Sequence, residues 1–235
     1  MIDLTVNKGN LALNVQKARD NNIIVPNLKQ MYDPEKYVPE KIKKALTDVD
    51  LWDVNPLNLF RISWKNDLKS GLYGGPNFIE LPGKLTGVKA RIICMVGKFF
   101  PTGCHKVGAS FGCLAPRLVT GQFDASTKKA VWPSTGNYCR GGAFNSKLLA
   151  CESVAILPEG MSQERFSWLS KIAGEVIATP GTESDVKEIF DKTNEIKATR
   201  NDCMIFNQFE EMGNYLWHYN VTGRAVAEAF ESIKG

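Results

Sequence analysis

The strongest constraint on the fold is a regular alternation of strand-like and helix-like stretches that begins near residue 88. Short runs rich in β-branched and apolar residues predict strands over 88–96, 130–133, 153–160, 175–181 and 203–209. Apolar residues at helical spacing predict helices over 106–121, within 134–152, and over 161–174, 183–199 and 225–233. Strands joined through helices require crossover connections, which are right-handed and leave the strands parallel. The chain is therefore predicted to be an α/β protein with a largely parallel sheet.

Several residues predict where these helices begin and end. Pro116 should kink or end the helix over 106–121, because proline cannot donate a backbone hydrogen bond. Ser162 should cap the start of the helix over 161–174, and Gly174 should close it. The first 80 residues differ from the rest, since prolines punctuate short helical stretches there. They are expected to lie over a domain as an extension of short helices and loops.

Composition limits the classes of function. The chain has 235 residues, 43% hydrophobic and 23% charged, which is typical of a soluble globular protein. A net charge of +4, dispersed along the chain, does not favour nucleic acid or an anionic membrane. No apolar run is long enough to span a bilayer, and the N-terminus lacks the apolar core of a secretory signal.

The cysteines and histidines do not predict a disulfide framework or a metal site. Six cysteines without a CxxC pair are expected to be reduced thiols of a cytoplasmic protein. Only two histidines are present, and Cys104, His105 and Cys113 lack the usual spacing of zinc ligands.

A first candidate motif runs from Pro101 to Ser110, between a predicted strand and a predicted helix. Lys106 falls in the first turn of that helix, where free N–H groups disfavour a protonated amine. An amine held neutral is suited to Schiff-base chemistry. Taken alone, the motif is better explained by an exposed lysine that follows a turn.

A second motif runs from Ser134 to Phe144, where small and polar residues follow a strand and open a helix. Its backbone N–H groups and hydroxyls could converge on a carboxylate or a phosphate. The spacing matches neither GxGxxG nor a Walker loop, so nucleotide motifs are not supported. The alternative is an ordinary loop in which Ser134 or Thr135 caps the helix. Cys104 and Cys139, in the two glycine-containing loops, are either reactive thiols or small buried ones.

A third motif, Phe206 to Gly223, places aromatic and amide side chains around His218. His218 is either a base or a structural histidine among aromatics, and the latter is the more common case.

Taken together and in order, these motifs resemble the fold-type II pyridoxal phosphate enzymes, the superfamily of tryptophan synthase β, cysteine synthase and cystathionine β-synthase. The T-G-C-H-K stretch at 102–106 is similar to the T-G-A-H-K of tryptophan synthase β chains, and S-T-G-N at 134–137 is similar to T-S-G-N of cysteine synthases. NQF at 207–209 and HYNVTG at 218–223 resemble N-Q-F and H-Y-x-T-T-G. Upstream, the stretch 74–92 resembles the family's G-N-T-P-L opening. The resemblance covers residues 74 to 223 and implies an N-terminal portion of the tryptophan synthase β-like three-layer fold, incomplete in this chain.

The resemblance implies roles for individual residues. Lys106 would bind pyridoxal 5'-phosphate as a Schiff base and then act as the catalytic base at the substrate Cα. His105 would approach the cofactor phosphate, and Asn137 would hydrogen-bond the oxygen on the cofactor ring. The substrate carboxylate would be held by Ser134, Thr135, Gly136 and Tyr138. The implied reaction is β-elimination, β-replacement or related lyase chemistry on a small amino acid.

The resemblance also implies a domain organisation. Residues 1–85 would be the N-terminal extension, 129–201 a smaller α/β domain, and 86–128 with 202–235 part of the large cofactor-binding domain. The family's glycine-rich phosphate loop does not occur in these residues. The chain is therefore expected to need a second chain or a missing C-terminal half that carries that loop, and to form an oligomer.

Departures from the family pattern leave the substrate open. Tyr138 and Cys139 replace Thr-Gly, and Val107 and Gly108 replace a polar pair after the lysine, so cysteine synthase activity does not carry over. Thiol chemistry, ammonia elimination and carbon–carbon cleavage all remain possible reactions. The alternatives to an enzyme are a non-catalytic or truncated subunit that serves for partner binding, and an unrelated α/β domain that binds a phosphate or nucleotide through the Ser134 loop.

Overall fold

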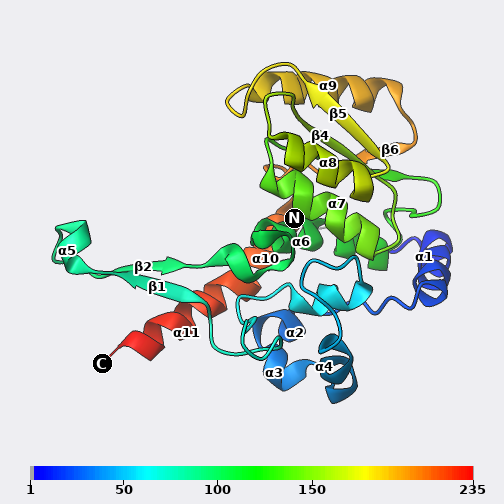
Figure 1. Cartoon of the computed structure of the whole chain (residues 1–235). Helices are drawn as coiled ribbons and strands as arrows, with labels where there is room; N and C mark the ends of the chain where they lie inside the picture. Colours follow the sequence, from blue (N-terminus) through cyan, green and yellow to red (C-terminus); the bar gives the residue numbers. More distant parts are fainter. Residues whose placement is uncertain (1–2, 235) are drawn as a thin grey trace.

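The computed structural model describes residues 3–234, and its centre is a four-stranded parallel sheet (Figure 1). The strands are β3 (Lys129–Pro133), β4 (Ser153–Pro158), β5 (Glu175–Thr179) and β6 (Cys203–Ile205), in the order β5-β4-β3-β6. Each neighbouring pair is parallel. The predicted α/β class and parallel sheet are confirmed.

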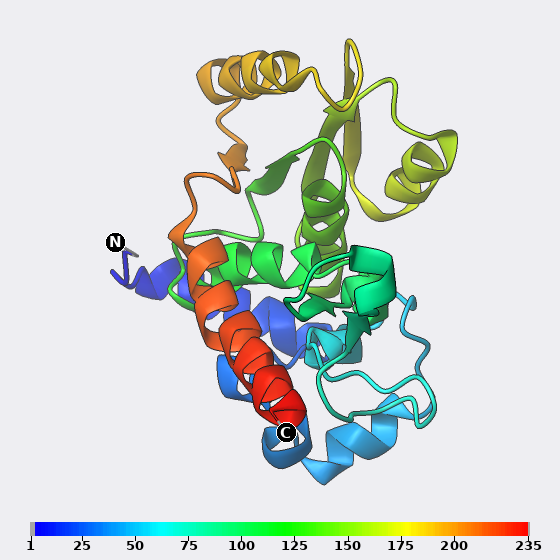
Figure 2. The same cartoon turned by 90° about the vertical axis from the view of Figure 1, so that its left-hand side faces the viewer.

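Helices cover both faces of this sheet, which makes three layers (Figures 1 and 2). Helices α7 (Asn137–Leu148) and α8 (Gln163–Ile172) lie on one face, and α9 (Val186–Thr199) lies on the other. Successive strand residues point to opposite faces. Trp132, Ala155 and Leu157 therefore join the core beneath α7 and α8, whereas Val131, Val154 and Ile156 join the one beneath α9.

The helix ends match the sequence signals except at Pro116. Ser162 caps α8 by accepting a hydrogen bond from the backbone N–H of Arg165, and α8 ends two residues before Gly174. Helix α6 (Lys106–Val119) does not end at Pro116 but continues to Val119, so an end of the helix at the proline is ruled out. The carbonyl of Pro116 still accepts from the backbone N–H of Thr120 at 3.1 Å, which keeps the last turn closed.

The predicted strand over 88–96 forms, but outside the parallel sheet. It is β2 (Ile92–Met95), which pairs antiparallel with β1 (Phe78–Leu81), and the short α5 (Gly83–Thr86) lies in the connection. So short a connection produces a hairpin, because a parallel partner needs a longer crossover. The hairpin projects from the body beside α11 (Gly223–Ile233), where Arg91 Nη1 donates to the carbonyl of Ile233 at 2.8 Å (Figures 1 and 2).

The first 80 residues form the short helices expected of them, together with one longer helix, α1 (Lys8–Asp20). The others are α2 (Leu28–Tyr32), α3 (Pro34–Tyr37), α4 (Glu40–Leu46) and the 3-10 turn η1 (Pro56–Arg61). The buried Asn14 side chain fastens α1 to the end of α6: its amide donates to the carbonyls of Leu118 and Phe123, and its oxygen accepts from the N–H of Ala125.

Helix α10 (Met212–Trp217) crosses α6 in close backbone contact. A Cβ on Gly112 would lie 2.4 Å from the carbonyl oxygen of Gly213, and a Cβ on Gly213 would lie 2.1 Å from that of Gly112. Gly108, one turn earlier on α6, leaves room for the buried ring of Trp217, which would lie 2.0 Å from a Cβ there. Small residues after the lysine therefore allow α10 to pack on α6.

The remaining segments connect these elements. They are η2 (Gly97–Phe99), η3 (Pro101–Gly103) and the π-helical turn η4 (His218–Thr222), which joins α10 to α11.

The division into an extension and two domains stays a prediction. Within residues 3–234, no helix combines the length and apolarity that crossing a bilayer would require.

Candidate functional site

The loop before Lys106 holds two consecutive residues in the left-handed region. Thr102 has φ 67° and Gly103 has φ 68°. Glycine adopts this conformation freely, whereas for a β-branched residue it is a genuine outlier that costs on the order of 1–3 kcal/mol. The Thr102 side chain is buried, and its hydroxyl has no hydrogen-bond partner in the described chain. Backbone strain of this kind is concentrated at functional sites.

Lys106 is the first residue of α6, as predicted, and its side chain is partly buried. Its ammonium donates to Oε1 of Gln208 at 3.3 Å. Within residues 3–234 it forms no ion pair with a carboxylate. The first and third sequence motifs, 102 positions apart, therefore meet at this amine.

The second motif lies against the same end of α6. A Cβ on Gly141 would lie 2.8 Å from the backbone N and Cα of Val107 and 3.0 Å from the carbonyl carbon of Lys106. Gly141 is one turn after Asn137, so the starts of the two helices approach each other. Asn137 is exposed at the first position of α7.

The loop before α7 is compact. The buried Ser134 hydroxyl accepts from the N–H of Gly136 at 3.2 Å, and the N–H of Ser134 donates to the carbonyl of Ile156 at 3.1 Å. Ser134 and Thr135 line a cavity of about 70 Å³ together with Asn207, Gln208 and Phe209. This small cavity connects the Ser134 loop to the amide that holds Lys106.

The Tyr138 side chain points away from this loop. It is buried, with its ring edge-on to Trp132 at 5.5 Å between centroids and its hydroxyl donating to Sγ of Cys113 at 3.4 Å. Burial raises the pKa of Tyr138. Only the backbone of Tyr138 is left to face the loop, so the replacement of threonine by Tyr138 adds no larger side chain there. Cys139 is fully buried and burial raises its pKa to about 12, which makes it an inert thiol.

The two histidines lie next to each other beside Lys106. The His105 ring stacks on Trp64 with centroids 5.6 Å apart, and the His218 ring lies 5.6 Å from that of His105. Nδ1 of His218 is 3.0 Å from the Thr222 hydroxyl, which also accepts from Nε1 of Trp64 at 2.9 Å. Burial lowers the pKa of both histidines: that of His218 falls to about 4, with further lowering by His105 and Lys106, and that of His105 is lowered further by Lys106. Both rings are therefore neutral near pH 7.

This neutral pair predicts a loss of stability in mild acid. An unfolded histidine binds a proton below about pH 6.5, whereas folded His218 stays neutral down to about pH 4. The unfolded state then holds more protons, so the free energy of unfolding falls as the pH drops from 6.5 towards 4. Between pH 7 and pH 5, the free energy of unfolding of the wild type should fall by on the order of 2 kcal/mol more than that of His218→Gln. Urea denaturation at pH 7 and pH 5 checks it, and equal pH dependence in variant and wild type would contradict it.

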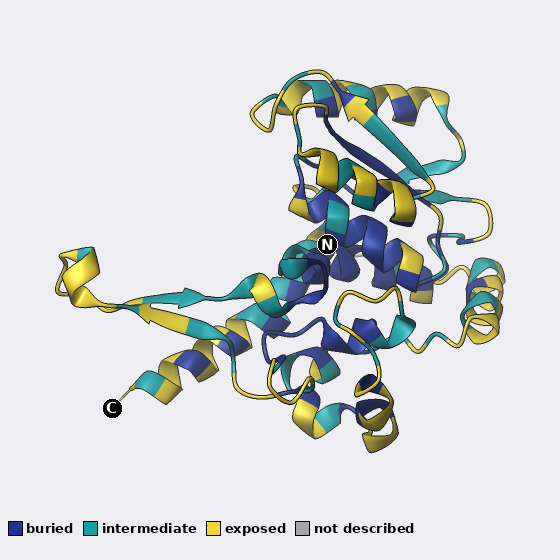
Figure 3. Cartoon of the chain, viewed as in Figure 1, coloured by how far each residue is buried: buried dark blue, intermediate teal, exposed yellow. Residues whose placement is uncertain are grey.

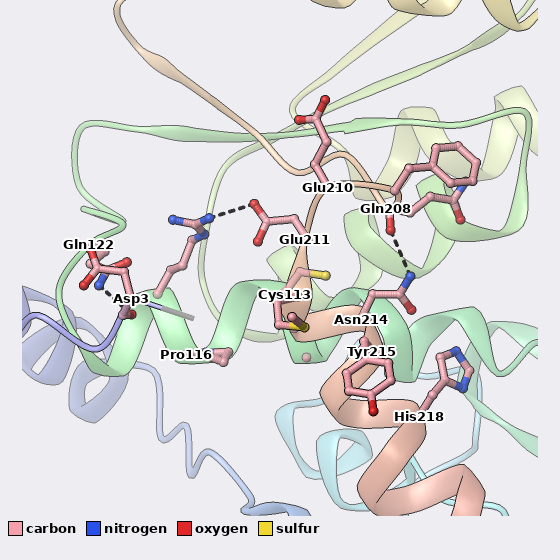
Figure 4. A pocket seen from close by; sticks show the side chains of 15 residues that line it. Asp3, Cys113, Pro116, Gln122, Gln208, Glu210, Glu211, Asn214, Tyr215 and His218 are labelled. Carbon is pink, nitrogen blue, oxygen red and sulfur yellow. Dashed lines mark hydrogen bonds and ion pairs between the residues drawn. The ribbon is translucent and has the colours of Figure 1, made fainter. Parts of the chain in front are cut away.

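A cavity between α6 and α10 is lined by residues of the third motif and by none of the first or second (Figure 4). Its volume is about 610 Å³, and Gln208 and His218 line it, whereas Lys106, His105 and residues 134–138 do not. Arg117 and Glu211 form an ion pair of 2.8 Å across it, and the Asn214 amide donates to the carbonyl of Gln208 at 2.9 Å. Lys106, and not this cavity, is where residues of all three motifs come together.

Some residues at the site carried no predicted role. Gln208 lies within the NQF motif, so the sequence contained its signal, although not its contact with Lys106. The sequence contained no such signal for Trp64 and Thr222, because these residues are far apart in the chain and meet only in the folded protein. The described part of the chain has no group of three or more His, Cys, Asp or Glu side chains arranged to hold a metal, and all six cysteines are free thiols.

Comparisons with known proteins agree with these motifs. No family model matches the chain. It is 26% identical over 160 residues to a cystathionine β-synthase of Saccharomyces cerevisiae, a match that covers 66% of this chain and 31% of that relative. It is 26% identical over 144 residues to a probable cysteine synthase of Bacillus subtilis, covering 61% of this chain and 46% of the relative. A cysteine synthase of Staphylococcus aureus is 34% identical over 101 residues, or 43% and 32% of the two chains. The chain spans less than half the length of these relatives.

Solved structures show the same fold. An O-acetylserine-dependent cystathionine β-synthase from Helicobacter pylori superposes with a TM-score of 0.58 at 19% identity, covering 66% of this chain and 51% of that one. An O-acetylserine sulfhydrylase from Entamoeba histolytica gives 0.57 at 20% identity, covering 67% and 48%. The chain is similar in sequence to cystathionine β-synthases and cysteine synthases, and about two thirds of it superposes on the fold-type II architecture of the solved structures. The resemblance inferred from the four motifs is confirmed.

Proposed function

We propose that this chain, a relative of the cysteine synthases and cystathionine β-synthases, is part of a pyridoxal-phosphate-dependent enzyme acting on a small amino acid. The observation that carries the proposal is the meeting of three motifs at Lys106. Lys106 begins α6, its amine donates to Gln208 of the third motif, and its backbone lies where Gly141 brings the second motif against α6. Cysteine synthases and cystathionine β-synthases use pyridoxal phosphate.

The residues around Lys106 fit this cofactor. The amine has no carboxylate partner within residues 3–234, and the buried Thr102 hydroxyl in the adjacent loop has an unused hydrogen-bonding capacity. Asn137 is exposed at the start of α7, where its amide would meet the oxygen on the cofactor ring. His105, neutral beside Lys106, would donate one ring N–H towards the cofactor phosphate.

The proposed chemistry assigns one task to each group. The cofactor, when bound, supplies the electron sink that makes the substrate Cα acidic. Lys106 takes the proton from Cα, with its amine oriented by the Gln208 side chain. Ser134, Thr135, Gly136 and the backbone N–H of Tyr138, at the start of α7, hold the substrate carboxylate. Loss or exchange of the group at Cβ follows, which is β-elimination, β-replacement or related lyase chemistry.

The proposal includes a further segment, in the same protein or in a second chain, that carries the phosphate-binding glycine loop. Exposed apolar side chains on α10 to α11 and on the hairpin support it: Tyr215, Tyr219, Val226, Phe230 and Ile79 have exposed fractions of 45–66%. Much of the hairpin and of α11 is exposed or half-buried (Figure 3). Apolar exposure of this extent marks surfaces that are covered in an assembly. The proposal also includes oligomer formation and, from the six free thiols, a cytoplasmic location.

The test is covalent trapping of the cofactor. We expect pyridoxal phosphate added to the chain to give a visible absorption band, and borohydride reduction to fix the cofactor on Lys106, as read by peptide mass spectrometry. Lys106→Ala should abolish the fixed adduct, because no other amine lies among the three motifs.

Lys98→Ala is the matched control, since Lys98 is exposed and only eight positions upstream. It should keep full labelling at Lys106. Labelling at another lysine in the wild type, or an undiminished adduct in Lys106→Ala, would refute the proposal.

A further inference from the structure

Two arginines lie at the Ser134 loop, of which Arg140 belongs to the second motif and Arg165 to none. Arg140, in the first turn of α7, has its guanidinium carbon 5.5 Å from the ring centre of Trp52 and 4.9 Å from that of Trp168. Arg165, from α8, donates from Nη1 to the carbonyl of Thr135 at 3.4 Å. That same Nη1 would lie 2.6 Å from a Cβ on Gly136, so the guanidinium of Arg165 covers the loop.

Neither arginine forms an ion pair within residues 3–234, although the charge of Glu164 lies near enough to Arg140 to offset part of the lowering of its pKa. No carboxylate lies within ion-pair distance of either group, in contrast to Arg117 and Arg200, which pair with acidic residues at 2.8 and 2.9 Å. Nε of Arg140 is buried and lacks a hydrogen-bond partner in the described chain. Arg61, also buried, instead donates to three backbone carbonyls.

The positive charge of Arg140 is destabilised by its surroundings. Burial lowers the pKa of its guanidinium, and the nearby charge of Arg165 lowers it further. Two like charges in a partly dry site repel each other, and an anion placed between them removes that repulsion. The planar guanidinium donates two parallel hydrogen bonds to a carboxylate or a phosphate.

The arginine pair also lies beside the proposed active site. A Cβ on Gly103, in the lysine loop, would lie 3.2 Å from Cζ2 of Trp52, the ring on which Arg140 stacks. Arg140 is three positions after Asn137 on α7. The pair therefore occupies the region between the lysine loop and the Ser134 loop, next to the backbone N–H groups assigned to the substrate carboxylate.

We propose that Arg140 and Arg165 together bind an oxyanion, a phosphate or a carboxylate, on the side chain of the amino-acid substrate. This rests on the proposed function, because the loop N–H groups then hold the α-carboxylate and leave the guanidinium groups for a second anion. The substrate class is an amino acid with an anionic side chain rather than a neutral one.

The experiment measures binding by the intact chain at constant ionic strength. L-phosphoserine, L-aspartate and L-serine are titrated, and tryptophan fluorescence reports binding because Trp52 and Trp168 flank Arg140. We expect at least one anionic amino acid to bind at least about tenfold more tightly than L-serine. Preference for phosphoserine identifies a phosphate, and preference for aspartate identifies a carboxylate.

Arg140→Gln and Arg165→Gln should each remove most of that preference, and Arg140→Lys should restore part of it. Circular dichroism establishes whether each variant is folded. If Arg140→Gln does not fold, Arg140→Lys still tests the role of the guanidinium. Arg224→Gln is the matched control, because Arg224 stacks on Tyr32 in the same way (4.4 Å) but is exposed on α11. Three results would overturn the proposal. L-serine could bind as tightly as both anions, none of the three amino acids could show saturable binding, or the folded Arg→Gln variants could keep the preference unchanged.

Repeating the titration with Lys106→Ala separates this proposal from the first one. The anion preference should survive in that variant, since neither guanidinium contacts Lys106. Failure of the trapping experiment with a retained anion preference would refute the enzyme assignment alone. Successful trapping without an anion preference would refute the arginine site alone.

Discussion

Gly213→Ala is expected to lower the free energy of unfolding by about 3 kcal/mol, the upper end for overpacking a tight interface. The added methyl would lie 2.1 Å from the carbonyl oxygen of Gly112 and 2.9 Å from Cα of Cys113. Both are backbone atoms of α6, so relief requires α10 to move as a body. That movement would also withdraw Trp217 from its buried position against Gly108. Urea denaturation followed by circular dichroism measures the change.

Gly223→Ala is the matched control for this prediction. Gly223 is also helical, yet its nearest neighbour would be the carbonyl oxygen of His218 at 3.7 Å, an ordinary contact. Alanine there should stabilise the protein by about 0.5–1 kcal/mol, because alanine has the higher helix propensity. Equal denaturation midpoints for the two variants would show that α10 does not lie against α6 as described.

Gly141→Ala is expected to reduce cofactor trapping on Lys106 by more than about tenfold, with a smaller effect on folding. The methyl would meet the backbone of Val107 at 2.8 Å and that of Lys106 at 3.0 Å. The start of α7 must then retreat from the start of α6, which separates Asn137 and the Ser134 loop from the lysine. Displacements of about 1 Å in catalytic geometry cost on the order of 100-fold in rate.

The measurement is the yield of reduced adduct on Lys106 at limiting pyridoxal phosphate, compared with the midpoint of thermal unfolding. Gly83→Ala serves as the control, since no atom lies within 4 Å of the added methyl. Full trapping in a folded Gly141→Ala variant would mean that the approach of the two helices does not position the site.

The parallel sheet could be predicted because each strand is a local apolar run, and the helices between the strands show apolar residues at helical spacing. Val131, Val154 and Ile156 on one face and Trp132, Ala155 and Leu157 on the other produce that pattern locally. The hairpin was not foreseen as a separate sheet, since which strand a run pairs with depends on the connection. The continuation of α6 through Pro116 was missed because tertiary contacts hold the last turn.

The residues of the candidate site could be predicted only in part. Lys106, His105 and the Ser134 loop could be found because they follow one another in short motifs. Their contacts could not, because the distance from Lys106 to Gln208 depends on how α6 and β6 are arranged. Tyr138 illustrates the limit: the sequence places it in the loop, but whether its ring faces the loop or the core is decided by the space beside Trp132. Arg140 and Arg165, 25 positions apart, come together only when α8 packs on α7.

The attachment of α1 to α6 has a practical consequence for shortened forms of the protein. Without α1, the carbonyls of Leu118 and Phe123 and the N–H of Ala125 would lose the Asn14 side chain, and the carbonyl of Thr120 would lose the N–H of Asn7. These groups close the far end of the helix whose first residue is Lys106. An affinity tag that displaces the first 20 residues, or a protease that removes them, would therefore fray the lysine helix from its distal end, although no residue near the amine had been altered.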